Sequence, residues 1–382
     1  MFFAKGIPSS EVGKKNSFIT NEYLTTIINQ KNIMIPTKGY AVHNSNDQLA
    51  PWSFERRDVG PNDIQIEIHY CGVCHSDIHQ VRSEWGPAKY PMVPGHEIVG
   101  RITNIGSDVK QFSVGDLAGV GCMVNSCQDC GNCKQGQQQY CEKGKTVWTY
   151  NSVESDGTTP TYGGYSNQII VDENFVVRIS KDLPLDGVAP LLCAGITTYS
   201  PLRKWKIGKG HRVGVLGLGG LGHMAVKFAA AFGAEVTMLS TSPQKEADAK
   251  KLGAHHFCLT TDPQQVRQFK NHFDFIIDTV SAKHNYDMYL KMLRTNGVHI
   301  CVGIPPEPIQ LTGPLLLGNS RTITGSNIGG IPETQEMLDF CAEHKIVSDI
   351  ELINIGYINE AYERILKSDV KYRFVIDMKT LK

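Results

Sequence analysis

The chain has 382 residues, enough for about two to three domains with large cores. Its 38 basic and 38 acidic residues give a net charge of zero, which argues against a general binder of nucleic acids or anionic membranes. Hydrophobic residues make up 41% and charged residues 20%, which excludes extensive disorder, and no apolar run of about 18 residues that could span a membrane is present.

The first 33 residues have neither the apolar segment and cleavage pattern of a secretory signal nor an Arg-rich transit pattern. Met34 offers an alternative start, and we expect residues 1–33 to be a disordered extension without a role. The eleven cysteines are an odd number and do not indicate a disulfide framework in so long a chain. We therefore expect the protein to lie in the reducing cytoplasm.

Residues 38–177 have the pattern of short β-strands. Runs such as residues 64–70 alternate apolar and polar side chains, and turns rich in Gly, Pro and Asp separate these runs. This alternation is typical of strands with one buried face. We predict that the first part of the chain forms a β-rich domain.

A compact cysteine motif in this part gives the clearest chemical indication. Cys127, Cys130, Cys133 and Cys141 follow the spacing Cys-x2-Cys-x2-Cys-x7-Cys. Tetrahedral zinc binds four thiolates, and short Cys-x2-Cys turns present them from a tight loop. Because sulfur takes all four positions, we predict a structural zinc with no open position for a substrate. An iron–sulfur cluster or a chance arrangement are the alternatives.

A second set of possible metal ligands is dispersed along the chain. Cys74 lies in Gly-Val-Cys-His-Ser-Asp, His96 in Pro-Gly-His-Glu and Cys193 in Leu-Cys-Ala-Gly. Two cysteines and one histidine are typical of a catalytic zinc, which keeps a fourth position for water or substrate. Each residue alone is weak evidence, because single cysteines are often buried core residues. Their combination with the four-cysteine motif and a nucleotide-binding fold predicts a catalytic zinc site.

From about residue 184 the pattern changes to strands that alternate with helices, which indicates a parallel, doubly wound sheet. The predicted strands lie at residues 212–216, 236–239, 257–259, 275–277 and 298–302. The predicted helices lie at residues 224–232 and 243–252, between residues 259 and 275, and from residue 286. After residue 326 the alternation stops, and we predict helices at residues 333–344 and 360–367 and a last strand at residues 373–376.

The first of these strands leads into a glycine-rich turn at residues 217–222, which has the pattern G-x-G-x-x-G and precedes a helix. Gly217 would form the turn, Gly219 would let the backbone approach a pyrophosphate, and Gly222 would let the helix pack on the strand. The N–H groups at the start of the helix then face the anion. We predict a dinucleotide site here, which also includes Gly220 and Leu221. A generic glycine turn is the alternative.

In chain order, these motifs resemble those of the zinc-dependent medium-chain alcohol dehydrogenases, in the cinnamyl alcohol dehydrogenase branch. The resemblance covers about residues 38–382. It implies an α/β fold with a GroES-like, β-rich catalytic domain at residues 34–184, which carries the structural zinc lobe. A Rossmann domain with a doubly wound parallel sheet would follow at residues 185–325, and residues 326–382 would return to the catalytic domain. Two zinc ions per chain and a homodimer are also implied.

The resemblance further implies roles around the dispersed zinc ligands. Glu97 would be a transient fourth ligand, and Asp77 would accept a hydrogen bond from His96. Ser76 and His79 would form a proton relay from hydroxyl to imidazole to solvent. The alternatives are that Glu97 is simply a buried, hydrogen-bonded carboxylate and that His79 is exposed without a role.

Residues that contact substrate and coenzyme are implied in the same way. Trp85 and Trp148 would form aromatic walls of the substrate pocket. Asn327 stands where relatives often carry a pocket aromatic, which leaves the identity of the substrate open. The residues implied beside the nicotinamide and its ribose are His75, Thr197, Thr279, Val302 and Ile304. For the last two, plain packing at the strand end is the alternative.

The end of the second predicted Rossmann strand bears on the choice of coenzyme. Domains that prefer NAD usually place Asp or Glu about 20 residues past the glycine turn. Here Ser240, Thr241 and Ser242 are followed by Lys245, with no acid between them. Hydroxyl groups can donate to a 2′-phosphate and a lysine can neutralise it, so we predict NADP(H). The alternative is that these residues only cap the next helix.

Together these observations predict an NADP(H)-dependent zinc enzyme that interconverts primary alcohols and aldehydes of aromatic or allylic type, such as cinnamyl or benzyl compounds. One alternative is another medium-chain enzyme such as a polyol dehydrogenase, but those enzymes often carry a carboxylate at the position of Cys193. The other is a non-enzymatic zinc- or redox-sensing protein, against which the intact open zinc site argues. The expected partner is a small aldehyde or alcohol, and neither nucleic acid nor membrane.

Overall fold

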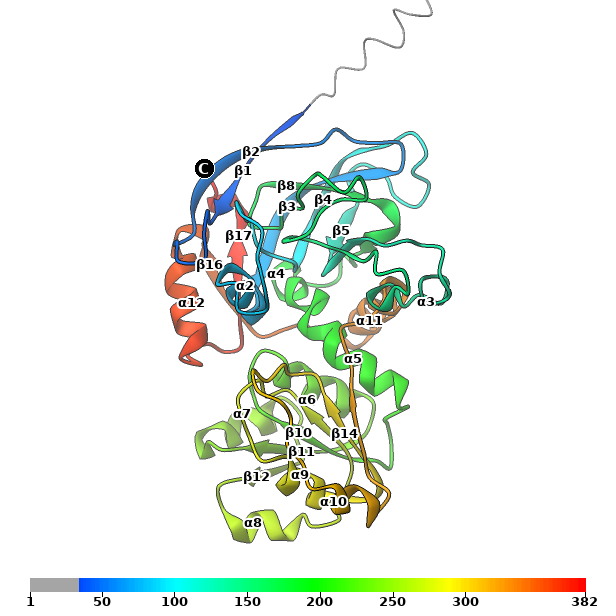
Figure 1. The fold of residues 1–382 in the computed structure, drawn as a ribbon, viewed down its shortest axis with the longest axis vertical. Coiled ribbons are helices and arrows are strands. Elements are labelled where there is room, and N and C mark those ends of the chain that lie inside the picture. Colours follow the sequence, from blue (N-terminus) through cyan, green and yellow to red (C-terminus); the bar gives the residue numbers. More distant parts are fainter. Residues whose placement is uncertain (1–33) are drawn as a thin grey trace, which may run out of the picture.

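The computed structural model describes residues 34–382, and the N-terminal extension discussed above lies outside the described residues. A seven-stranded sheet forms the core of one part of the molecule and a six-stranded sheet that of the other (Figure 1). Both the β-rich part and the parallel-sheet part that the sequence predicts are therefore present. The site described below lies where the two parts meet.

The seven-stranded sheet has the strand order β16-β17-β3-β4-β5-β9, and β8 also pairs with β3. The strands form where apolar and polar side chains alternate. In β3, Ile64, Ile66 and Ile68 are buried, while Glu67 is exposed. β17 pairs antiparallel with β3, so the end of the chain returns to the first sheet. The bounds are β3 Asp63–Val73, β4 Ile98–Ile105, β5 Leu117–Val120, β8 Gln168–Asp172, β9 Val177–Arg178, β16 Ile350–Asn354 and β17 Arg373–Asp377.

Smaller elements surround this sheet. The strands β1 (Ile35–Ala41) and β2 (Ala50–Arg56) form an antiparallel pair. The strands β6 (Met123–Asn125) and β7 (Val147–Trp148) form a second pair, from which the four-cysteine lobe with α3 (Gly131–Lys134) extends. The helices that accompany the sheet are α2 His75–Val81, α4 Leu185–Val188, α11 Ile331–His344 and α12 Ile358–Leu366.

The six-stranded sheet is parallel throughout, with the order β12-β11-β10-β13-β14-β15. In chain order this is 3-2-1-4-5-6, the arrangement of dinucleotide-binding folds, with its switch point between β10 and β13. The strand bounds are β10 Arg212–Leu216, β11 Glu235–Ser240, β12 His256–Leu259, β13 Phe273–Asp278, β14 Leu293–Cys301 and β15 Thr322–Gly325. The helices are α6 Gly222–Ala231, α7 Glu246–Lys251, α8 Pro263–Gln268, α9 Tyr286–Met292 and α10 Gly313–Leu317.

The structure differs from the sequence-based expectation in a few elements. The helix expected at residues 243–252 begins with a 3-10 turn at Pro243–Lys245, and α7 follows it. Such turns are common where a helix starts. The short edge strands β15 and β16 were not predicted, because their pairing partners lie elsewhere in the chain. None of the helices formed by residues 34–382 is long and apolar enough to cross a membrane.

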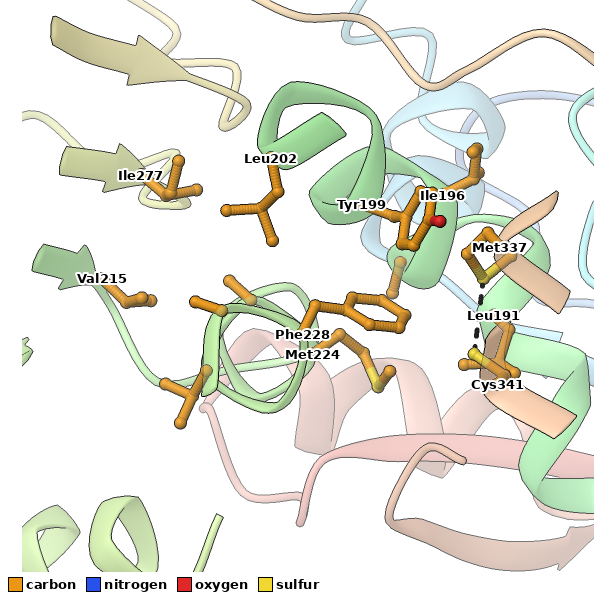
Figure 2. Packing of buried hydrophobic residues seen from close by; sticks show 14 of the residues in the cluster. Leu191, Ile196, Tyr199, Leu202, Val215, Met224, Phe228, Ile277, Met337 and Cys341 are labelled. Atoms are coloured by element: carbon orange, nitrogen blue, oxygen red, sulfur yellow. Dashed lines mark hydrogen bonds between the residues drawn. The ribbon is translucent and has the colours of Figure 1, made fainter. Parts of the chain in front are cut away.

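A hydrophobic cluster packs residues of α5 and α11 against the parallel-sheet part (Figure 2). Helix α5 (Ala194–Lys204) starts directly after Cys193 and packs against α6 and α11. The ring of Tyr199 lies edge-to-face on Phe228 at 5.4 Å, and its hydroxyl donates to Glu336 at 2.9 Å. Because α5 begins at Cys193, this packing fixes the position of one candidate metal ligand relative to the parallel sheet.

A buried histidine makes the stability of this junction depend on pH. His223 in the first turn of α6 lies between the Gly219 carbonyl oxygen (3.2 Å) and the Ser348 hydroxyl (3.0 Å). Burial lowers the pKa of His223 from its usual 6.5 to about 4. The unfolded chain therefore binds the proton first on acidification. The contribution to stability is complete above pH 6.5 and is lost as the pH falls towards 4.

We expect His223→Gln to flatten this pH dependence. For the unmodified chain, the free energy of unfolding should fall by about 2 kcal/mol more between pH 7 and pH 5 than it does for the variant. Urea unfolding at the two pH values measures this difference directly. If the free energy of unfolding fell equally with pH in the two proteins, His223 would not be the cause of the pH dependence.

Candidate active site

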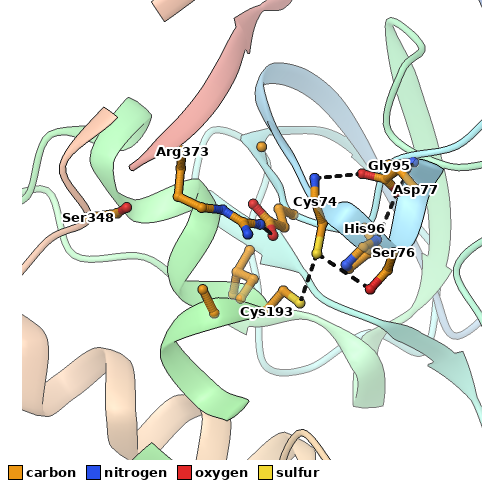
Figure 3. Close-up of polar contacts among 12 residues, drawn as sticks. Cys74, Ser76, Asp77, Gly95, His96, Cys193, Ser348 and Arg373 are labelled. Atoms are coloured by element: carbon orange, nitrogen blue, oxygen red, sulfur yellow. Dashed lines mark hydrogen bonds and ion pairs between the residues drawn. The ribbon is translucent and has the colours of Figure 1, made fainter. Parts of the chain in front are cut away.

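The dispersed donor residues come together near the ends of β3, α2, β4 and α5 (Figure 3). Cys74 follows β3 and starts α2, His96 precedes β4, and Cys193 precedes α5. Their donor atoms and one oxygen of Glu97 all lie within 4.8 Å of one another, and all four residues are buried. The Sγ atoms of Cys74 and Cys193 are 3.9 Å apart. Two thiolates on one tetrahedral zinc would be separated by about 3.8 Å.

Asp77 holds this donor group in place. One carboxylate oxygen accepts from His96 Nδ1 (3.1 Å) and from the Gly95 N–H (3.1 Å). The other accepts from the Cys74 N–H (2.9 Å) and the Tyr165 hydroxyl (3.1 Å). The carboxylate therefore fixes the histidine ring, as partners of metal-binding imidazoles do. Asp77 thus makes the hydrogen bond with His96 that the resemblance implies.

A buried ion pair adjoins the donor group. Arg373 at the start of β17 donates to one carboxylate oxygen of Glu97, and both side chains are buried. The other oxygen of Glu97 is buried and has no hydrogen-bond partner among the described residues. A Cβ atom on Gly72 would lie 1.9 Å from this oxygen, so only glycine fits there. An unpartnered carboxylate oxygen beside two thiols and an imidazole fits a bound divalent cation.

The surroundings favour the thiolate form of Cys74, whereas hydrogen bonds with Cys122 and Cys74, together with burial, raise the pKa of the Cys193 thiol well above its usual value. A hydrogen bond from Cys193 and the positive charge of Arg373 lower the pKa of the Cys74 thiol well below its usual value, against the effect of burial. The donor types and their separation fit zinc. Cys74, His96 and Cys193 leave one tetrahedral position open.

The four predicted lobe cysteines also converge. Their sulfur atoms lie within 4.8 Å of one another. The Sγ atoms of Cys127 and Cys133 are 3.8 Å apart, and those of Cys130 and Cys141 are 4.0 Å apart. Four sulfur donors at these separations match a closed tetrahedral zinc site, with no position left for a substrate.

A cleft of about 480 Å³ runs between the two parts of the molecule. A Cβ at Gly219 would meet nothing within 4 Å, so this glycine leaves the backbone open to a ligand. At Gly222 a Cβ would lie 1.8 Å from the Gly217 carbonyl oxygen, so this position lets helix and turn pack closely. The lining includes residues 217–221, Ser242, Lys245 and Thr279 on one side and Val73, His75 and residues 370–374 on the other.

The cleft contains only part of the residue set expected for the coenzyme. The Ser240 hydroxyl faces its own turn, where it accepts from the Ser242 N–H at 3.1 Å. Ile304 is 54% exposed and Val302 is buried. Among the described residues, Thr197, Gly222, Ser240, Thr241, Val302 and Ile304 do not line the cleft. Their proposed contacts with the coenzyme remain predictions.

Other residues of the cleft were missed by the sequence reasoning. Asp248 lines the cleft beside Lys245 and pairs with Lys371 from the opposite wall at 2.6 Å. The sequence reasoning considered the absence of an acid between Ser240 and Lys245, but not this carboxylate three positions further on. Arg373 also lines the cleft and lies against Gly220, where a Cβ would be 2.8 Å from its side chain. Only the fold brings these distant residues together.

The two members of the predicted proton relay, Ser76 and His79, each have other partners in the structure. Cys74 Sγ lies 3.4 Å from the Ser76 hydroxyl. His79 contacts the Glu84 carboxylate through Nδ1, and its ring stacks between those of His75 (5.5 Å) and Trp85 (4.8 Å). No hydrogen bond joins Ser76 to His79 among the described residues. A proton would therefore need an intermediate carrier between them.

The three predicted pocket residues lie at partly open positions. Trp85 is 42% exposed and stacks on His79, and Trp148 at the end of β7 is 38% exposed. Asn327 is exposed, and its backbone N–H donates to the Tyr140 hydroxyl at 2.9 Å. Their contact with a substrate remains a prediction.

A further polar cluster, which sequence reasoning did not find, lies at the carboxyl end of β13. The buried Asp278 accepts from the ring nitrogens of His284 (2.9 Å) and His299 (3.0 Å) and from the Val280 N–H (3.0 Å). Cys301 is adjacent. Because three donors already satisfy this carboxylate, we interpret the cluster as a hydrogen-bond network. It fixes the strand end that presents Thr279 to the cleft.

Comparisons with known proteins identify the family. The GroES-like domain of alcohol dehydrogenases matches residues 60–181, and the zinc-binding dehydrogenase domain matches residues 220–343. The NADP-dependent alcohol dehydrogenase C 1 of Mycolicibacterium smegmatis is 53% identical over 349 residues, which cover 91% of this chain and 100% of that protein. The 8-hydroxygeraniol dehydrogenase of Catharanthus roseus is 51% identical over 342 residues, 89% of this chain and 94% of that protein.

Solved structures agree with the sequence comparisons. A cinnamyl alcohol dehydrogenase of Sorghum bicolor has a TM-score of 0.88 at 43% identity, covering 91% of this chain and 99% of that one. The CAD of Helicobacter pylori, determined with NADP(H), has a TM-score of 0.86 at 46% identity, covering 92% of this chain and 100% of that one. The chain therefore belongs to the zinc-dependent medium-chain alcohol dehydrogenases, in the cinnamyl alcohol dehydrogenase branch. The predicted family and its GroES-like and Rossmann fold are confirmed.

Proposed function

We propose that this enzyme interconverts primary alcohols and aldehydes of aromatic or allylic type with NADP(H). The observation that carries the proposal is the continuity of the two sites. Cys74 belongs to the donor group and the adjacent His75 lines the cleft. A coenzyme held along the glycine turn would therefore reach towards the residues that would hold a metal. Relatives named as NADP-dependent, cinnamyl alcohol and 8-hydroxygeraniol dehydrogenases support both the coenzyme and the substrate class.

The side chains around the site have different roles in the reaction. Zinc held by Cys74, His96 and Cys193 would supply Lewis acidity to the aldehyde or alcohol oxygen, and the nicotinamide coenzyme would supply or accept hydride. We assign the transfer of the proton to the Ser76 hydroxyl, which lies beside Cys74. Asp77 orients His96, and the two walls of the cleft exclude water from the reacting groups.

An activity assay tests the proposal. NADPH absorbance should decrease when cinnamaldehyde or benzaldehyde is added to the zinc-loaded enzyme. A panel of aldehydes would then rank the substrates. Turnover of polyols without turnover of any aromatic or allylic aldehyde would contradict the proposed substrate class.

The coenzyme preference should depend on Lys245. Its side chain lines the cleft at 2.7 Å from the Leu218 carbonyl oxygen, and Ser242 lies beside it. A charged hydrogen bond to a 2′-phosphate contributes about 1.5–3 kcal/mol, so Lys245→Met should raise the KM for NADPH about tenfold or more. The KM for NADH should change little. Ser242→Asp should reverse or flatten the preference for NADPH, because Ser242 lines the cleft and a carboxylate there would repel the 2′-phosphate.

Lys250→Met provides the matched control. Lys250 is exposed on α7, the helix that follows the turn of Lys245, and pairs with Glu246, so its replacement should leave both coenzyme constants unchanged. Steady-state kinetics with each coenzyme measures the preference. Equal catalytic efficiency of the unmodified enzyme with NADH and NADPH would show that residues 240–245 do not form a 2′-phosphate site.

We also propose a homodimer that resides in the reducing cytoplasm. β15 is the edge strand of the parallel sheet, and Leu317 nearby is 84% exposed, as is common where a sheet edge is covered by a partner. The eleven cysteines, all within the described residues, form no disulfide, which suits a reducing compartment. A monomer in sedimentation equilibrium, or a native disulfide, would contradict the respective part of this proposal.

A further inference from the structure

The four-cysteine lobe contacts the segment that connects β15 to α11, residues 326–330, here called the linking segment. This segment carries Asn327, which the sequence analysis assigns to the substrate pocket. We propose that Tyr140 and Gln138 of the lobe are positioning residues for this pocket wall, so that the lobe sets the affinity for the aldehyde. The inference rests on the proposed function and adds a role for a lobe otherwise regarded as structural.

Two hydrogen bonds join the lobe to this region. The Asn327 N–H donates to the Tyr140 hydroxyl oxygen at 2.9 Å, and the Ile331 N–H donates to Gln138 Oε1 at 3.1 Å. Gln138 and Tyr140 bound the single 3-10 turn that ends the lobe. Within the lobe, this turn is fixed by Asn132, which donates to the Tyr140 carbonyl oxygen at 2.7 Å. The lobe therefore presents both acceptors from one rigid turn.

Gln138 also caps a helix by accepting this hydrogen bond. The first N–H groups of a helix have no partner within the helix. The N-cap of α11 is Gly330, which has no side chain, and Pro332 has no N–H to donate. The Ile331 N–H therefore depends on Gln138, which lies 193 positions earlier in the chain. Without this acceptor the start of α11 would lose its cap.

Backbone packing brings the two segments into close contact, and Figure 1 shows α3 of the lobe beside α11. A Cβ on Gly330 would lie 1.5 Å from the Gly136 carbonyl oxygen. A Cβ on Gly136 would lie 3.0 Å from the ring of Pro332. Glycine at both positions permits this approach, so the lobe and the linking segment cannot shift independently.

The other side of the linking segment leads towards the metal site. Ile328 has a φ of 38°, a conformation that a β-branched residue adopts only when its surroundings impose it. It borders a small cavity together with Cys122 and Leu192, the residue before Cys193. A Cβ on Gly329 would lie 2.6 Å from Ile196 of α5. The linking segment is thus held between the lobe and the helix that follows a metal ligand.

These contacts predict an effect on the aldehyde and little effect on the coenzyme, because the coenzyme cleft is lined by other residues. Tyr140→Phe removes one acceptor and keeps the ring, and Gln138→Leu removes the other. Each variant should raise the KM for cinnamaldehyde about fivefold, the usual effect of one lost hydrogen bond, while the KM for NADPH stays within about twofold. Gln138→Glu keeps an acceptor for Ile331 and should restore the KM for cinnamaldehyde.

Hydrogen exchange provides a readout that does not require activity. In both variants, amides in the peptide of residues 326–334 should exchange about fivefold faster than in the unmodified zinc-loaded enzyme. Gln137→Leu is the matched control, because the exposed Gln137 is the neighbour of Gln138 in the same lobe. This control should alter neither exchange nor kinetics, and its metal content should remain equal to that of the other variants.

The outcomes separate the inference from the proposed function. Unchanged exchange in residues 326–334, or equal increases in both KM values, would overturn the positioning role. A failure of Gln138→Glu to restore the KM of cinnamaldehyde would also overturn it. If the unmodified enzyme reduces no aldehyde, the proposed function fails and the role in aldehyde affinity falls with it. Faster exchange in that case would still confirm the contacts between the lobe and the linking segment.

Discussion

Replacing Cys193 by alanine should reduce turnover to background and leave about one zinc per chain instead of two. Cys193 is one of the three zinc ligands predicted for the open site. Its Sγ atom lies 3.9 Å from that of Cys74. Its loss removes one of the two thiolates, and the Glu97 carboxylate, which already pairs with Arg373, is a poor replacement, so zinc should be lost from this site. The lobe cysteines lie in a separate part of the fold, so their metal should remain. Elemental analysis, turnover and circular dichroism of the variant measure the three expectations.

Cys258→Ala is the matched control for this experiment. Cys258 is a buried thiol of β12 that belongs to neither metal-binding group. Its replacement should leave two zinc ions per chain and normal turnover. One zinc in the unmodified protein, or full activity of Cys193→Ala, would contradict the assignment of two sites.

The features that sequence alone could predict are those with a local signature. The four lobe cysteines lie close together in the sequence, so their spacing already constrains the geometry of a metal site. The glycine turn directly joins a strand to a helix, which is equally a local pattern. The strands of the parallel sheet could be predicted for the same reason, because each is a short apolar run bounded by turns. The dispersed ligands Cys74, His96 and Cys193 required the resemblance, because no local spacing relates them.

The remaining features depend on contacts between distant parts of the chain. Arg373 pairs with Glu97 across 276 positions, and Lys371 pairs with Asp248 across 123 positions. Neither pair has a sequence pattern, because β17 is brought beside β3 only when the sheet is complete. The inward turn of the Ser240 hydroxyl could not be predicted either. In a strand, neighbouring side chains point to opposite faces, but the bend that follows Ser240 redirects its hydroxyl towards Ser242.

Ser76→Ala should lower kcat by about two to four powers of ten, the usual contribution of a positioned proton donor or acceptor. The Ser76 hydroxyl lies 3.4 Å from Cys74 Sγ and is the hydroxyl group that the resemblance assigns to proton transfer. The alanine variant should bind NADPH and retain zinc as the unmodified enzyme does, because Ser76 belongs neither to the donor group nor to the lining of the cleft. Steady-state kinetics, coenzyme titration and metal analysis of the same sample test these expectations together.

Two further variants show whether the hydroxyl itself carries the proton. Ser76→Thr keeps a hydroxyl at the same position and should retain most of the activity. His79→Gln should have a smaller effect than Ser76→Ala, because His79 is engaged with Glu84 and no direct hydrogen bond joins it to Ser76 among the described residues. A Ser76→Ala enzyme with the kcat and pH profile of the unmodified protein would remove Ser76 from the mechanism. An equal loss in Ser76→Thr would show that the side chain acts through packing and not through its proton.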